Sequence, residues 1–107
     1  MFIDSSHVSK LGSDVNYYLF NIFPLLKKGV IIHIHDIFYP FEYPNEWLKQ
    51  KRYWNEGYMI HAFLQWNKGF DILLFNSYIQ IRFPELLKKN LPICSKVGGA
   101  QMWLVKK

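Results

Sequence analysis

One stretch of the chain decides how the rest folds: Lys28-Gly29-Val30-Ile31-Ile32-His33-Ile34-His35-Asp36. A glycine opens it, a short apolar run follows, and the run ends in His-Asp before a loop that contains prolines. Such a bounded apolar run is typical of a strand buried on both faces at the centre of a sheet. Ligands of open α/β sheets bind beyond the carboxyl ends of the strands, so we expect His35 and Asp36 to lie at a site.

The flanking segments predict helices that alternate with strands. We expect strands at 1–4, 70–75 and 101–105, helices at 45–51, 54–66 and 83–89, and an aromatic, proline-containing loop at 37–44 that forms a pocket wall or lid. This order indicates one α/β domain over residues 1–107, with a mostly parallel sheet and flanking helices.

The segment after Ser13 predicts the first helix, of about 14 residues. Ser13 is a suitable N-cap, and Val15, Leu19 and Ile22 recur at helical spacing. Pro24 falls inside this pattern, so we expect the last turn to be distorted there.

Composition and charge exclude several classes of protein. The formal net charge is +5, but the basic residues fall in short separate groups, which argues against a nucleic-acid partner. No apolar run approaches the roughly 18 residues that cross a bilayer, so we expect no membrane partner. Cys94 is the one cysteine of the sequence, which predicts a reducing, cytoplasmic setting and a small buried side chain.

Several motifs together resemble the second half of class I S-adenosylmethionine-dependent methyltransferases. The subgroup is the metal-dependent O-methyltransferase or cephalosporin hydroxylase-like one, in which the fourth strand ends in Asp-x-x-His and the fifth ends in His-Asp. The stretches that carry the resemblance are Phe2-Ile3-Asp4-Ser5-Ser6-His7, Asp14, Pro24-Leu25-Leu26-Lys27-Lys28-Gly29-Val30-Ile31, His35-Asp36, Trp54-Asn55-Glu56, the strand 70–75 and Gly98-Gly99-Ala100-Gln101-Met102-Trp103-Leu104.

The resemblance implies a partial Rossmann-like sheet. The chain is similar to strands four to seven of the family, in the order 4-5-7-6 and with strand seven antiparallel. It lacks the Gly-x-Gly loop of the N-terminal half, so we expect a truncated domain without cofactor-binding residues, although the full-length family uses S-adenosylmethionine. The strand at Met1–Asp4 would then be an exposed edge, and we expect a homo-oligomer or another partner to cover it.

The resemblance also implies a site. Asp4 and Asp36 would hold Mg²⁺ or another divalent metal, with His35 as a further ligand that shifts the preference toward a softer ion. His7 would be the general base.

Other side chains of the same region have alternative interpretations. We expect Tyr39, Trp54 and Tyr58 to line the pocket of a small-molecule acceptor, although aromatic residues at helical spacing are also typical of a core. Asp4 and Asp36 could instead cap the turns that follow their strands. Glu56 would serve the helix dipole or a substrate.

Two functions of different classes follow. The first is methyl transfer from S-adenosylmethionine to a small hydroxylated acceptor, by positioning of the acceptor oxygen and its deprotonation through His7 or a metal. The second is a non-catalytic binding or oligomerisation module that keeps the half-fold without cofactor.

Overall fold

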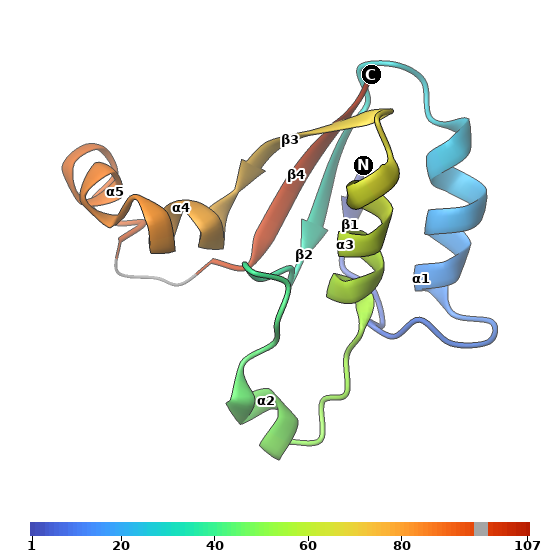
Figure 1. Cartoon of the computed structure of the whole chain (residues 1–107), viewed down its shortest axis with the longest axis horizontal. Coiled ribbons are helices and arrows are strands. Elements are labelled where there is room, and N and C mark those ends of the chain that lie inside the picture. The colour runs from blue at the N-terminus through green and yellow to red at the C-terminus, as the bar shows by residue number, and fades with distance from the viewer. Residues whose placement is uncertain (96–98) are drawn as a thin grey trace.

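The computed structural model describes residues 1–95 and 99–107 and contains a four-stranded mixed sheet (Figure 1). The strands are β1 Phe2–Ile3, β2 Ile31–His35, β3 Phe70–Phe75 and β4 Gln101–Lys106, in the order β1-β2-β4-β3. β1 and β2 pair in parallel, and β4 is antiparallel to both β2 and β3. The expected strand order and the antiparallel last strand are confirmed. β1, β2 and β3 run in the same direction, but the sheet is mixed, because β4 lies between β2 and β3 and makes two of the three pairings antiparallel.

The predicted central strand is confirmed as β2. It lies between β1 and β4, and its side chains alternate between the two faces of the sheet. Ile32 and Ile34 are fully buried on one face. His33 is 8% exposed on the other, where its ring lies against those of Phe2 and Trp103 at centroid distances of 4.8 and 4.4 Å.

The first helical segment begins as predicted and is distorted as predicted. The Ser13 hydroxyl accepts a hydrogen bond from the Asn16 backbone N–H and caps α1, Asp14–Tyr17. A π-helical turn, Tyr18–Ile22, and a 3₁₀ turn, Phe23–Leu25, follow. Pro24 lies in the 3₁₀ turn, where its missing N–H and its ring prevent regular α-helical hydrogen bonding.

Four further helices are described, α2 Asn45–Lys49, α3 Glu56–Trp66, α4 Asn76–Arg82 and α5 Pro84–Asn90. Figure 1 shows α4 and α5 beside the end of β3, and α2 beyond the end of β2. α4 was not expected; it follows β3 directly. Gly98, which belongs to one of the stretches that carry the resemblance, lies outside the described residues.

The core forms where the first helical segment and α3 pack against one face of the sheet. Its fully buried members include Val15, Phe23, Ile32, Ile34, Ile60, Met102 and Leu104. The apolar strand β3 contributes little to this core. It is an edge strand, and its middle residues Ile72, Leu73 and Leu74 are exposed.

Two expectations from composition have different outcomes. Cys94 is exposed, so the prediction of a buried cysteine is wrong; it lies in the turn after α5, at the edge of the molecule. Within residues 1–95 and 99–107, no helix has the length and apolar character needed to cross a membrane.

Substitution of Phe23 tests how much this core contributes to the free energy of unfolding. The Phe23 ring is fully buried and lies 5.6 and 5.7 Å from the rings of Phe63 and Phe70. Phe23→Ala should lower the free energy of unfolding by about 3–5 kcal/mol, because it removes buried area and leaves a cavity. Urea denaturation measures this, with Phe20→Ala, at an exposed position of the same segment, as the control. Equal losses in the two variants would contradict the described core.

Candidate functional site

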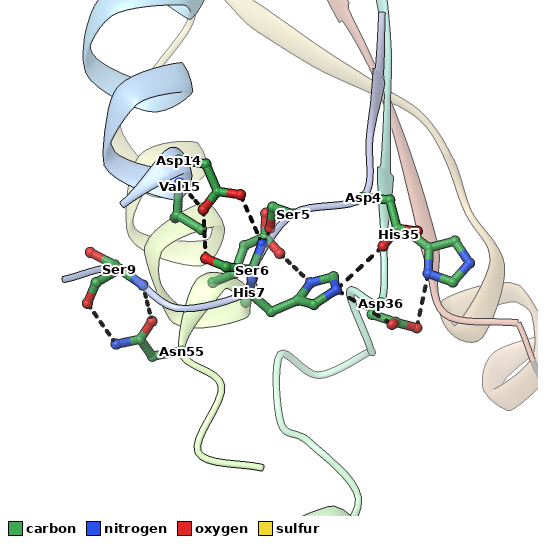
Figure 2. A network of polar contacts seen from close by, with 12 residues as sticks. Asp4, Ser5, Ser6, His7, Ser9, Asp14, Val15, His35, Asp36 and Asn55 are labelled. Atoms are coloured by element: carbon green, nitrogen blue, oxygen red, sulfur yellow. Dashed lines mark hydrogen bonds and ion pairs between the residues drawn. The ribbon is translucent and has the colours of Figure 1, made fainter. Parts of the chain in front are cut away.

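Three donor side chains meet at the carboxyl ends of β1 and β2. Asp4 follows β1 directly, Asp36 follows β2 directly, and His7 lies in the loop after β1. His7 Nε2 is 3.4 Å from Asp4 Oδ1 and 3.7 Å from Asp36 Oδ2, and one ligand atom from each residue lies within 4.8 Å of the others. Figure 2 shows the His7 ring directed toward both carboxylates. The parallel pairing of the two strands brings them together.

The N-terminus of α3 holds the loop that carries His7. The His7 carbonyl accepts hydrogen bonds from the backbone N–H groups of Asn55 (3.0 Å) and Glu56 (3.1 Å). The Ser9 N–H donates to Asn55 Oδ1, and the Asn55 side-chain amide donates to the Ser9 carbonyl (Figure 2). These bonds fix the loop on the helix without using the imidazole ring.

The N-terminus of α1 holds the same loop from the other side. The Asp14 carboxylate accepts hydrogen bonds from the Ser6 N–H (2.9 Å) and the Ser6 hydroxyl (2.5 Å), as Figure 2 shows. The hydrogen bond from the Ser6 hydroxyl is the largest cause that lowers the pKa of Asp14. The loop between β1 and α1 is therefore anchored at two helix N-termini.

The backbone is strained at two of the three donors. His7 has φ +57° and Asp36 has φ +56°, in the left-handed region. Such conformations cost roughly 1–3 kcal/mol for residues other than glycine and concentrate at functional sites. Here they turn the chain sharply after each strand, so that both side chains face the same point.

A buried hydrogen-bonded chain continues from the far side of the His7 ring. His7 Nδ1 lies 2.7 Å from Glu56 Oε2, and the Tyr18 hydroxyl donates to Glu56 Oε1. Glu56 is fully buried, and Tyr18 and His7 are also buried. The indole of Trp54 stacks on the imidazole at a centroid distance of 4.0 Å.

Burial and the surrounding carboxylates act in opposite directions on His7. Burial lowers its pKa, but the hydrogen bond and charge of Glu56, with the charges of Asp36 and Asp4, outweigh it and raise the pKa. Burial and the neighbouring Glu56 carboxylate also raise the pKa of Tyr18, so its hydroxyl remains a donor.

A hollow of about 490 Å³ lies beside Asp36. Its wall includes His35, and the loop and helix after β2 contribute aromatic side chains. Those side chains are Phe38, Tyr39 and Trp47. The Tyr39 N–H donates to Ser77 Oγ at 2.8 Å, which anchors the loop across the hollow.

The remaining predicted residues lie around this group rather than in it. His35 Nδ1 is 3.1 Å from Asp36 Oδ1, but His35 is outside the three-donor group. Trp54 stacks on the face of the His7 ring and does not line the hollow beside Asp36. Tyr58 is exposed, and its hydroxyl donates to Glu42 at 2.7 Å.

The sequence did not predict the contacts of Glu56 with His7 and with Tyr18. Glu56 was expected to serve a helix dipole or a substrate, and Tyr18 carries no signal beyond its place next to an apolar helical stripe. The stretch Trp54-Asn55-Glu56 carries part of the resemblance, and with the helix predicted at 54–66 it is the sequence signal that points to this helix start.

Comparison of the chain with protein-family models, curated proteins and solved structures finds no significant match.

The raised pKa of His7 predicts how stability changes with pH in the metal-free chain. The stabilisation from charged His7 is complete below its unfolded-state pKa of 6.5 and is lost as pH rises through the higher folded-state pKa. Urea unfolding in the presence of a chelator should therefore show a gap in unfolding free energy between wild type and His7→Asn that narrows as the pH rises above 6.5. Asn tolerates the left-handed backbone. A gap that stays constant or widens would contradict the assigned environment.

Proposed function

We propose that this chain forms the metal- and acceptor-binding half of a class I S-adenosylmethionine-dependent methyltransferase that methylates a small hydroxylated acceptor. The observation that carries the proposal is the convergence of Asp4, His7 and Asp36 at the carboxyl ends of two neighbouring parallel strands. Open α/β sheets bind their ligands at this edge.

The sheet supports the same proposal. Its order β1-β2-β4-β3, with β4 antiparallel, is the order expected for strands four to seven of that family. The chain has no Gly-x-Gly, so it offers no glycine-rich cradle for the cofactor. Its own contribution is therefore the acceptor side of the reaction.

The donor set suits a divalent cation. Ligands about 2.1 Å from one ion lie roughly 3–4 Å apart, and the His7–Asp4 and His7–Asp36 separations of 3.4 and 3.7 Å fall in this range. Two carboxylates suit Mg²⁺ or Mn²⁺, and the imidazole shifts the preference toward transition metals. A bound divalent ion lowers the pKa of an acceptor hydroxyl.

The residues of the chain then have separate tasks. Asp4 and Asp36 supply negative charge, and His7 Nε2 supplies a nitrogen donor or accepts the hydroxyl proton. The hollow beside Asp36, with Phe38, Tyr39 and Trp47 in its wall, holds the acceptor next to these groups. The single cysteine favours a reducing, cytoplasmic setting for this chemistry.

Removal of one carboxylate tests the metal site. Mn²⁺ titration followed by electron paramagnetic resonance should show binding to the wild type and an affinity at least about tenfold lower for Asp36→Asn. Asp71→Asn is the control, because Asp71 lies on β3, away from the site, where it pairs with Lys107 at 2.8 Å. Absence of Mn²⁺ binding to the wild type, or equal affinities in the three proteins, would exclude this metal site.

Calorimetric titration with S-adenosylhomocysteine tests the reaction class. Because the chain lacks the glycine-rich cradle, we expect S-adenosylhomocysteine to bind more weakly than micromolar, and we expect Mg²⁺ to strengthen this binding in the wild type but not in Asp36→Asn. A chain that binds no S-adenosylhomocysteine with or without Mg²⁺ would instead be a non-catalytic binding or oligomerisation module of the same fold.

A further inference from the structure

We infer that Glu56, held by the Tyr18 hydroxyl, is a positioning residue that keeps the proton of the His7 ring on Nδ1 and directs Nε2 toward Asp4 and Asp36. The expected effect of Glu56 on metal affinity rests on the proposed metal site. The hydrogen-bonded chain on which the inference is built is independent of any ion.

The first step is the geometry of the hydrogen bonds that link Tyr18, Glu56 and His7. Glu56 is fully buried, yet each of its carboxylate oxygens has a partner: Oε1 accepts from the Tyr18 hydroxyl, and Oε2 lies 2.7 Å from His7 Nδ1. A buried carboxylate is retained only when it is paired and hydrogen-bonded. The two partners come from the first helical segment and from the loop after β1, so they hold the carboxylate from two directions.

The second step is the chemistry of the ring. An ionised carboxylate only accepts hydrogen bonds, so Nδ1 next to Glu56 has to carry a proton. A neutral imidazole has one N–H, which leaves Nε2 as a bare acceptor directed at two further carboxylates. Three acceptors at one point repel one another unless a cation or a proton lies between them.

The third step is the orientation of the ring. Trp54 stacks on one face of the imidazole, and the bonds of the His7 carbonyl to the N-terminus of α3 fix its backbone. The bond to Glu56 then determines which nitrogen faces the two aspartates. A carboxylate that accepts a hydrogen bond from the nitrogen that does not face the metal orients a metal-binding histidine in this way, and its removal costs about 10–100-fold in metal affinity.

The test replaces both Tyr18 and Glu56, so that the Tyr18 hydroxyl is not left unpaired and only the His7 ring loses a hydrogen-bond partner. Tyr18→Phe/Glu56→Leu exchanges the pair for apolar side chains of similar size, which is far less disruptive than removal of one partner. The control Tyr58→Phe/Glu42→Leu makes the same two changes in an exposed pair, in which the Tyr58 hydroxyl donates to Glu42 at 2.7 Å. Long-range proton–nitrogen NMR of the His7 ring gives the position of its proton.

The wild type should show Nδ1 protonated at every pH at which it is folded, with a slowly exchanging N–H. The core double variant should lose this single state and bind Mn²⁺ about 10–100-fold more weakly, whereas the control should keep both properties. Tyr18→Phe alone, which keeps the carboxylate, should retain the Nδ1 proton.

A neutral His7 with its proton on Nε2 in the wild type would overturn the inference, and so would a folded core double variant with wild-type tautomer and Mn²⁺ affinity. If the wild type bound no Mn²⁺, the proposed metal site would fail, but the wild-type tautomer would still decide the role of Glu56. If the double variant did not fold, the wild type and Tyr18→Phe would decide it.

Discussion

The buried carboxylate of Glu56 is the constraint on which the site region depends. A charge without access to water costs several kcal/mol unless its oxygens are satisfied, so every neighbour has to be in place at once. Tyr18 and His7 supply the two partners, from the helical segment after Ser13 and from the loop after β1. One residue thereby links three segments that are distant in the sequence.

The parallel pairing of β1 and β2 is the second constraint. The register places Phe2 opposite His33 and Ile3 opposite Ile34, so the two strands end side by side. The left-handed conformations of His7 and Asp36 then turn the chain back toward the common edge. The strain at His7 is tolerated because both neighbouring helices hold its loop, through Asn55 on one side and Asp14 on the other.

Electrostatics make this edge of the sheet acidic in an otherwise basic protein. Asp4, Asp36 and Glu56 surround one imidazole, although the chain has a formal net charge of +5. Such a concentration of acceptors is unfavourable without a positive charge between them. Charged His7 meets this need in the free chain, and a divalent ion meets it in the proposed function.

Residue patterns alone predicted most of the elements and a site at the ends of two strands, but not the helix α4. The apolar run at 30–34 identified the central strand, Ser13 and Pro24 predicted the start and the distortion of the first helix, and polar residues after two strands predicted a site at their ends. These features are local, because propensity, capping and periodicity act within a few residues. The tertiary structure decided that β4 lies between β2 and β3, that β3 is exposed at the edge, and that His7 rather than His35 joins the two aspartates. It also decided the contact between Glu56 and Tyr18, which are 38 residues apart. No periodic pattern contains such a contact, because it forms only when two helices and a loop pack together.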